Sequence, residues 1–201
     1  SSLSLSIGPT FLRCPGKALS QPPSCPGNPV QMHDAVYGCL TSGCAQGTVF
    51  GDLFEEINSI SLNKKIKINH QQLINLSKKI NTEPSLYLSV GAIHGCVLCK
   101  GENPLYYFED VGRHNAVDKI AGLILEKKIN VKEMSFYTTG RLTSEMVLKC
   151  IKMEIPILLS RSGFTAWAVE IARKKNLTMI GRIRGKRFNI LSGDFRYTDN
   201  E

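Results

Sequence analysis

Two carboxylates, a guanidinium and an imidazole occur in one short run, as Glu109, Asp110, Arg113 and His114. Side chains of these types move protons or bind anions, and charged clusters of this density are typical of functional sites. A structural interpretation competes, in which Asp110 caps a following helix while Arg113 and Lys119 are solvated. The number of charged groups favours a site at this turn.

Cys44 is the candidate nucleophile. It lies in a run of small residues, 41–47, which lets a large partner approach closely and leaves amide N–H groups free to stabilise a thiolate. The competing interpretation is a buried cysteine that acts as a small hydrophobe. Residue chemistry alone supports the two interpretations equally.

Cys96 and Cys99 have the C-x-x-C spacing of redox and metal sites, but they fall in a predicted strand. Residues three apart on a strand point to opposite faces, so the thiols diverge and we predict two core cysteines. No second pair completes a zinc site. His94, near the start of the same strand, is equally compatible with a binding role and with a hydrogen-bonded core histidine.

The formal charge of the chain is +8, and the excess is concentrated near the C-terminus. Residues 171–201 contain eight basic and three acidic side chains, punctuated by Gly181 and Gly185. This pattern favours a phosphate-binding loop over a nucleic-acid surface, because few aromatic residues are available there for base stacking. No apolar run is long enough to span a bilayer, so we expect no membrane partner. Seven cysteines, an odd number, indicate a reducing cytoplasm.

Strands alternate with helices along most of the chain, which predicts βαβ units and an α/β fold around a mixed, largely parallel sheet. Residues 1–30 are rich in proline and glycine, so we predict an irregular segment followed by one domain, 31–201. Residues 182–187 are predicted as a basic loop. Helices are predicted at 70–80, from 116 onward, at 144–152 and at 166–175. Strands are predicted at 86–90, 93–99, 105–108, 134–138, 156–160, 177–181 and 188–191.

Three strand-to-helix turns occur at equivalent points of this pattern. They carry Arg113 and His114, Gly140 and Arg141, and Ser160 and Arg161. In α/β sheets, ligands bind outside the carboxyl ends of the strands. We therefore expect hydroxyls, glycines and guanidiniums to meet at one edge of the sheet and to form a pocket for a large anionic ligand.

The chain from residue 37 to its C-terminus resembles the FdhD family, the accessory sulfurtransferases needed for active formate dehydrogenase. The most specific match is the segment 109–119, and further matches are 41–44, 140–146, 160–162, 165–170, 177–181 and 184–185. The resemblance implies a cytidine-deaminase-like, three-layer α/β/α fold. We expect no bound zinc and no deamination, because His94-Gly95-Cys96 lacks the glutamate of H-x-E and no P-C-x-x-C is present.

By this resemblance, Cys44 accepts sulfur from a cysteine desulfurase as a persulfide and passes it to the molybdenum bis-guanine-dinucleotide cofactor, before the cofactor is inserted into formate dehydrogenase. The cofactor is thus a bound substrate. The binding stretch of the family maps onto Arg182, Ile183, Arg184, Gly185, Lys186 and Arg187. The implied binding set further contains His94, Arg113, His114, Gly140, Arg141 and Ser160. Whether the chain forms a homodimer is left open.

Three departures from the family pattern bear on this function. Gly47 stands where many members have the second cysteine of a C-x-x-C, so transfer relies on a single persulfide unless Cys39 substitutes. The Thr-Gly-Gly-x-His segment expected ahead of His94 is Val-Gly-Ala-Ile-His here, and residues 1–29 match no part of the family. The alternative function is therefore a non-catalytic chaperone that binds the cofactor or a guanine nucleotide.

Overall fold

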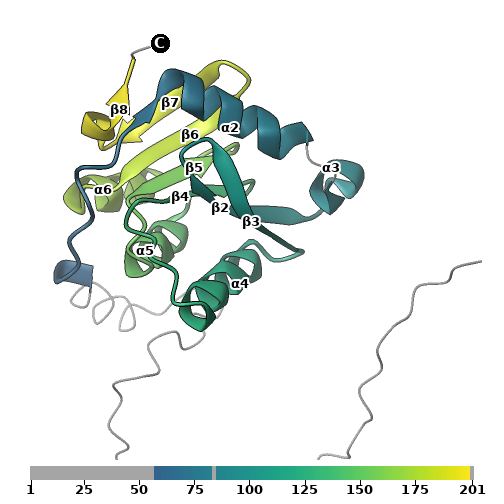
Figure 1. Cartoon of the computed structure of the whole chain (residues 1–201), viewed down its shortest axis with the longest axis horizontal. Coiled ribbons are helices and arrows are strands. Elements are labelled where there is room, and N and C mark those ends of the chain that lie inside the picture. The colour runs from purple at the N-terminus through teal and green to yellow at the C-terminus, as the bar shows by residue number, and fades with distance from the viewer. Residues whose placement is uncertain (1–56, 83–84, 200–201) are drawn as a thin grey trace, which may run out of the picture. The chain divides into compact units, whose positions relative to one another are not determined.

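The computed structural model describes residues 57–82 and 85–199 of the 201-residue chain. All of them belong to one of the two units into which the chain divides, Thr41–Glu201. Cys39, Cys44 and the expected domain boundary at residue 30 lie outside the described residues. The described elements are β1 (Ile68–Asn69), α2 (His70–Thr82), α3 (Leu86–Val90), β2 (His94–Lys100), β3 (Asn103–Asp110), α4 (Arg113–Glu126), β4 (Ser135–Thr138), α5 (Ser144–Lys152), β5 (Ile157–Ser160), α6 (Ala166–Lys174), β6 (Thr178–Arg184), β7 (Arg187–Ser192), a 3-10 turn (Asp194–Arg196) and β8 (Tyr197–Thr198) (Figure 1).

Six of these strands form one mixed sheet in the order β3-β2-β4-β5-β6-β7. β4, β5 and β6 run parallel, whereas β2 is antiparallel to β3 and β4, and β7 is antiparallel to β6. The prediction of a mixed sheet is confirmed, but the prediction that it is largely parallel is wrong, since three of the five pairings are antiparallel. Tight turns join β2 to β3 and β6 to β7, and such short connections are possible only between antiparallel strands.

Helices cover both faces of this sheet (Figure 1). On one face, α4, α5 and α6 pack against alternate residues of the central strands, in a core that includes Leu98, Phe136 and Leu158. On the other face, α2 packs Leu73 and Leu76 against the strand residues in between. Central strands such as β2 and β4 are therefore apolar on both faces, which explains why their sequences show no alternation of polar and apolar residues.

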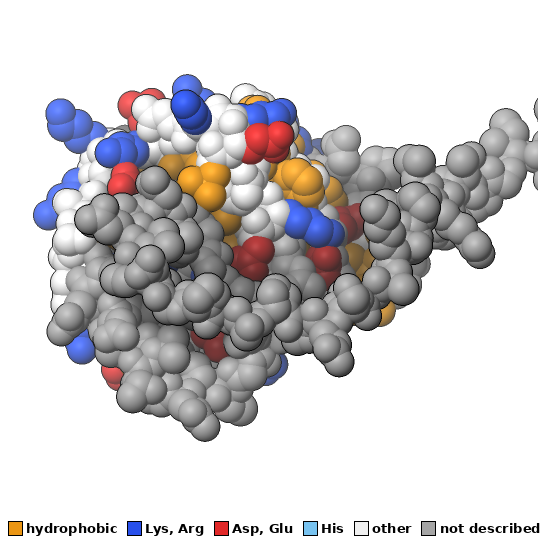
Figure 2. Space-filling view, turned by 90° about the horizontal axis from the view of Figure 1, so that it is seen from below, with side chains coloured by type: hydrophobic (Ala, Val, Ile, Leu, Met, Phe, Trp, Pro, Cys, Tyr) orange, Lys and Arg blue, Asp and Glu red, His pale blue; other side chains and the backbone are white. Residues whose placement is uncertain are grey.

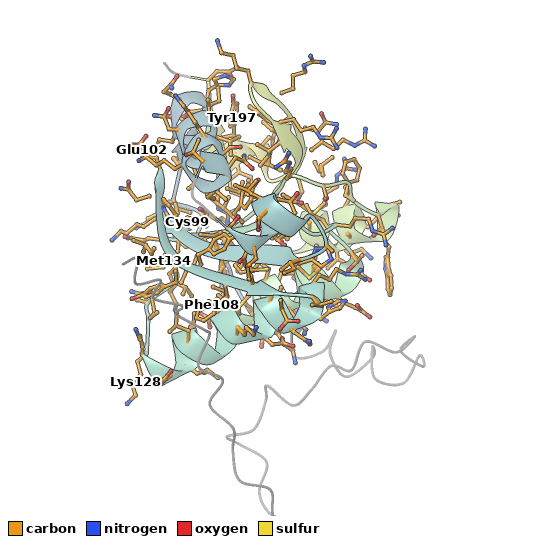
Figure 3. The ribbon with its side chains drawn as sticks, turned by 90° about the vertical axis from the view of Figure 1, so that its right-hand side faces the viewer. Cys99, Glu102, Phe108, Lys128, Met134 and Tyr197 are labelled. Carbon is orange, nitrogen blue, oxygen red and sulfur yellow. The ribbon has the colours of Figure 1, made fainter. Side chains whose placement is uncertain are left out.

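Cys96 and Cys99 lie on opposite faces of β2, as the strand geometry predicts. Cys96 belongs to the core beside α4, α5 and α6, and Cys99 to the core beside α2. Figure 3 shows Cys99 in the interior, whereas Lys128 projects outward beyond the end of α4. Burial raises the pKa of the Cys96 thiol to about 12 and also raises the pKa of the Cys99 thiol. Both are core cysteines, and neither is a low-pKa nucleophile.

The prediction of a strand at 86–90 is wrong, because these residues form the short helix α3. Their side-chain types have strand propensity, but the helix is capped at both ends. The Ser85 hydroxyl accepts a hydrogen bond from Leu88 N, and Gly91, with φ 73, ends the helix in the left-handed region. Local caps thus override the propensity of the residues between them.

The basic segment 182–187, predicted as a loop, is a β-hairpin. β6 extends to Arg184, β7 begins at Arg187, and only Gly185 and Lys186 form the turn. Gly185 has φ 59, which favours glycine and suits the first position of a two-residue hairpin turn. The other predicted helices and strands are confirmed, with ends that differ by a few residues.

Candidate anion-binding site

The carboxyl ends of the parallel strands β4, β5 and β6 lie at one edge of the sheet, which we call the rim. Thr138 at the end of β4 pairs with Ser160 at the end of β5, and with Cys96 near the start of β2. His94 in turn pairs with Asp110, where β3 ends and the turn to α4 begins. The three strand-to-helix turns therefore meet at one edge, as the sequence predicts. α3 lies beside the same ends of β2 and β3 (Figure 1).

Hydrogen bonds connect the turns of the rim to one another. The Ser160 hydroxyl donates to Gly140 O (2.7 Å), and the Ser162 hydroxyl donates to Thr139 O (2.6 Å). Thr139 in turn accepts from Gly95 N through its hydroxyl (2.9 Å) and donates its own N–H to Gly95 O (2.9 Å). Ser160 is fully buried, so its hydroxyl supports the rim from within. That Ser160 belongs to the binding set stays a prediction.

Arg113 packs closely against Gly140 at the centre of the rim. A Cβ atom placed on Gly140 would lie 3.3 Å from Arg113 Cβ and 3.4 Å from Thr138 Oγ1, so a side chain at this position would displace its neighbours. Arg141, the next residue, is exposed to solvent. The glycine predicted at this turn is therefore required by the close approach of the arginine.

Two nitrogen atoms at the rim are buried and have no hydrogen-bond partner among the described residues: His94 Nδ1 and Arg113 Nε. Burial lowers the pKa of His94, and the positive charge of Arg113 lowers it further. The imidazole is therefore neutral at pH 7, and its neighbour carries the charge. Because buried polar atoms are rarely left without partners, these two nitrogens mark a place that a polar ligand or a water molecule can complete.

The carboxylate of Asp110 stabilises the turn itself. It accepts hydrogen bonds from Gly112 N (2.8 Å) and Asn115 Nδ2 (3.1 Å), and it forms an ion pair with Lys119 Nζ (2.8 Å). The hydrogen bond from Lys119, followed by that from Gly112 N, lowers the pKa of Asp110 to about 2. Asp110 thus has a structural role in the turn, but it does not cap α4 as the structural interpretation expected. Lys119 and Arg113 are not simply solvated either, since Lys119 pairs with Asp110 and Arg113 buries its Nε.

Glu109 is also fully engaged, at the start of α3. Its two oxygens accept hydrogen bonds from Leu86 N (3.0 Å) and Tyr87 N (2.7 Å), and Tyr107 donates its hydroxyl to the same carboxylate (2.8 Å). A negative charge at the start of a helix is favourable. The contacts of Glu109 and Asp110 therefore give both carboxylates a structural role in holding this turn.

His114 faces α5 and not the solvent. Its Nε2 lies 3.0 Å from Glu145 Oε2, and its side chain is only 11% exposed. Burial is the main cause that lowers the pKa of His114, while the charge of Glu145 raises it. The structure thus places His114 between two helices at the rim, where the imidazole contacts a protein carboxylate.

The β6–β7 hairpin carries an open groove of about 780 Å³ next to the rim. Its lining residues are Gly163, Arg182, Arg184, Arg187, Phe188 and Asn189. Arg184 and Arg187 are directly opposite each other on the paired strands. Lys186 and Gly185 form the exposed tip of the hairpin. The Ile183 side chain is buried against the α2 side of the sheet and does not line the groove, so a binding role for Ile183 stays a prediction that rests on its place in the stretch 182–187.

The groove is joined to the rim through Arg182. Its backbone has φ 55, its N–H donates to Ser162 O (3.0 Å), and its guanidinium lies over the ring of Phe164, 5.5 Å from the ring centre. Among the described residues, Arg182, Arg184 and Arg187 form no ion pair with a carboxylate. On the face shown in Figure 2, by contrast, Lys and Arg side chains lie beside acidic ones. The groove is therefore a concentration of uncompensated positive charge.

Several residues of this region could not be predicted from the sequence. Glu145 contacts His114, and Lys149 forms an ion pair with Asp118, across two helices. The only signal in the sequence is that each helix repeats a charged residue after four positions, a spacing that is common on solvated helices. Asn189 lines the groove from β7, together with its neighbour Phe188, which also packs against the core beside α2.

No His, Cys, Asp and Glu side chains gather in threes as a metal site within residues 57–82 and 85–199. The helices in that part of the chain are too short or too polar to cross a membrane.

Comparison with known proteins gives consistent matches. The profile of the FdhD/NarQ family matches residues 27–198. The proteins named sulfur carrier protein FdhD from Staphylococcus aureus strains MRSA252 and Newman are 34% and 33% identical to this chain over 137 residues. That region is 68% of this chain and 52% of each relative, so the chain spans about half the length of the curated relatives it matches.

A solved structure is also similar. It is the crystal structure of a formate dehydrogenase accessory protein from Desulfotalea psychrophila, with 32% sequence identity and a TM-score of 0.65. The superposition covers 72% of this chain and 62% of the other. It supports the mixed α/β architecture described above.

Proposed function

This chain belongs to the FdhD/NarQ family, and on that premise we propose that it is a sulfur carrier that serves formate dehydrogenase. In this proposal, Cys44 accepts sulfur as a persulfide from a cysteine desulfurase. It passes the sulfur to the molybdenum bis-guanine-dinucleotide cofactor, which is bound as a substrate. The transfer takes place in the cytoplasm, before formate dehydrogenase receives the cofactor. The fold is of the cytidine-deaminase type without its zinc chemistry.

The observation that carries the binding half of the proposal is the arginine groove beside the rim. Arg182, Arg184 and Arg187 have no acidic partner in the described part of the chain, and two of them face each other across paired strands. Like charges in this position repel each other, so binding of an anion between them is favourable. A ligand that carries several phosphates matches this need.

The rim supplies the second half of the binding surface. Arg113 and His94 each have an unpartnered buried nitrogen there, and Gly140 keeps the adjoining space free of a side chain. In the proposal, the phosphates occupy the groove arginines, and Arg113, Arg141 and His94 contact a phosphate or a base edge. Gly185 and Lys186, at the tip of the hairpin, belong to the same binding stretch in this proposal.

The chemistry assigned to Cys44 is thiolate attack on a persulfide. The Cys44 thiolate bonds to the outer sulfur of the desulfurase persulfide, the S–S bond of the donor breaks, and the donor cysteine leaves as a thiolate. Cys44 then holds one sulfane sulfur. On delivery, the Cys44 S–S bond breaks, the cysteine leaves as a thiolate, and a two-electron-reduced molybdenum centre takes the sulfur as sulfide. A single cysteine suffices for both steps, which is consistent with Gly47 at the second position.

Mass spectrometry of the full chain tests the sulfur-transfer half. We expect incubation with a cysteine desulfurase and cysteine to add one sulfur atom to the peptide that contains Cys44, and a thiol reductant to remove it. Cys44→Ala should abolish this label, whereas the matched variant Cys39→Ala should keep it. Full labelling of Cys44→Ala would refute the assignment. Loss of the label in Cys39→Ala would instead make Cys39 the substitute for the missing second cysteine.

A non-catalytic chaperone is the second candidate, favoured by one observation, the glycine at position 47. It predicts that GDP, a probe for the guanine-nucleotide ends of the cofactor, binds equally well to wild type and to Cys44→Ala. It also predicts that the wild-type chain gains no sulfur from the desulfurase. The two candidates therefore differ in the labelling experiment and agree on nucleotide binding.

A further inference from the structure

Four titratable side chains lie between α4 and α5 and form what we call the charge quartet: His114, Asp118, Glu145 and Lys149. His114 Nε2 is 3.0 Å from Glu145 Oε2, and Lys149 Nζ is 2.6 Å and 2.8 Å from the two oxygens of Asp118. On each helix, the two members are four residues apart, so they lie on one face and one turn from each other. The quartet thus consists of two pairs, each of which joins α4 to α5. We call each pair a rung, and the His114–Glu145 rung is nearer the rim.

The rim rung connects two turns of the candidate site. His114 follows Arg113 at the start of α4, and Glu145 is in the first turn of α5, directly after the turn that carries Gly140 and Arg141. Neither helix has a side-chain N-cap: Gly112 offers none, and the Thr143 hydroxyl is buried without a partner among the described residues. The first turns of α4 and α5 therefore lack capping side chains, and the His114–Glu145 contact joins these two turns to each other.

The charge of Arg113 acts on the histidine of the quartet. Lys149 balances Asp118 within the second rung. Burial, more than any other cause, lowers the pKa of His114, and the charges of Arg113 and Lys149 lower it further, against Glu145 and Asp118, which raise it. His114 is therefore neutral at pH 7 and donates its Nε2–H to Glu145.

We propose that His114 and Glu145 are positioning residues: their contact fixes Arg113 and the turn at 140–143 relative to each other, and neither residue touches the ligand. This inference rests on the proposed function, because the ligand is that of the rim. It changes the role expected for His114 from direct binding to preorganisation.

GDP binding to the full chain tests the proposal. We expect His114→Leu to weaken GDP binding by about tenfold, a size typical of coupled neighbouring residues. His114→Gln, whose amide can still donate to Glu145, should stay within about threefold of wild type. Lys149→Met is the matched control in the second rung, since it leaves only the half-exposed Asp118 without its partner. This variant should be less stable yet bind GDP normally.

A double-mutant cycle separates positioning from contact. If His114 acts through Arg113, His114→Leu should have no further effect on GDP binding once Arg113→Met is present. Glu145→Ala provides a second route to the same comparison if His114→Leu does not fold, as judged by circular dichroism. Additive effects, or equal loss in Lys149→Met, would overturn the positioning role while leaving the proposed function intact. Failure of wild type to bind GDP would overturn both.

Discussion

The rim and the groove lie next to each other, but they hold their arginines in opposite ways. At the rim, Arg113 packs against Gly140 and buries its Nε, within turns that are hydrogen-bonded to one another. In the groove, Arg182, Arg184 and Arg187 are exposed on a hairpin. The rim thus restricts the orientation of a guanidinium, whereas the groove concentrates positive charge on side chains whose orientation is not fixed.

This difference assigns separate tasks to the two regions. Exposed charges attract an anion over a distance, but salt screens them and their side chains remain free to move. A packed arginine forms fewer contacts, yet its geometry is set before the ligand arrives, so less conformational entropy is lost on binding. We therefore expect the groove to supply most of the affinity for phosphate and the rim to determine which ligand orientation is accepted.

The largest expected effect comes from removal of the groove charges. In the triple variant Arg182→Met, Arg184→Met, Arg187→Met, GDP affinity should fall on the order of 100-fold, or about 2.7 kcal/mol in total. This is about 1 kcal/mol for each arginine, below the about 1.5–3 kcal/mol of a charge-assisted hydrogen bond, because all three side chains are exposed and solvent screens them. The salt dependence of binding should also become shallower. The free energy of unfolding should change by less than about 1 kcal/mol, since the lost cation–π contact of Arg182 is offset by relief of charge repulsion. Calorimetric titration at two salt concentrations and urea unfolding measure these quantities.

A matched variant separates the groove from the net charge of the chain. Lys64→Met, Lys100→Met and Lys128→Met together remove the same charge from exposed positions elsewhere. We expect this variant to bind GDP almost as wild type does. Equal loss of affinity in both triple variants would contradict a defined groove and would support diffuse attraction by the basic chain.

A smaller effect is expected from a change of shape at the rim. Gly140→Val places a side chain where even a Cβ lies 3.3 Å from Arg113 Cβ, so the arginine must move. We expect a loss of about tenfold in GDP affinity, together with a decrease of about 1–3 kcal/mol in the free energy of unfolding from overpacking. Gly122→Val is the control, because nothing lies within 4 Å of a Cβ at that position of α4. Unchanged GDP binding by Gly140→Val would show that the rim does not orient the ligand.

The sequence predicted the rim well because its logic is local and repetitive. Apolar strands, each followed by a polar turn and an amphipathic helix, place their turns at one sheet edge whatever the details of packing. Helix α3 and the quartet could not be predicted in this way. The Glu109 carboxylate accepts a hydrogen bond from the N–H of Leu86, 23 residues away in the sequence, and Lys149 pairs with Asp118, 31 residues away. Such pairs depend on tertiary packing, which leaves no periodic signal.

The hairpin shows a different limit. A run of arginine, glycine and lysine reads as a loop, because charged residues and glycine are depleted in strands. Here β6 continues to Arg184, and its alternation decides the outcome: Ile183 enters the core beside α2, while Arg184 lines the groove. The charge of the segment could be predicted from the sequence, but the face on which each residue lies depended on the strand register.

The smallest expected effect is a decrease in the free energy of unfolding in mild acid, which comes from the rim and not from the groove. The pKa of His94 is lowered by burial and by the charge of Arg113, and the pKa of His114 is lowered chiefly by burial. An unfolded histidine titrates near 6.5, so the unfolded chain binds more protons than the folded chain once the pH falls through that value. The free energy of unfolding should therefore be highest above pH 6.5 and decrease as the pH falls toward 5.

Urea unfolding between pH 7.5 and 5 measures this decrease and assigns it to the rim. Above pH 5 the result is free of Asp110, whose pKa is lowered to about 2 by its hydrogen bond from Lys119. The double variant His94→Gln, His114→Gln should have a flatter profile than wild type, because the two buried imidazoles no longer take up protons on unfolding. The groove arginines keep their charge throughout this range, so the triple arginine variant should retain the wild-type profile. A flatter profile in the triple arginine variant would instead show that the groove and the rim are electrostatically coupled. The assignment of separate tasks to the two regions would then be wrong.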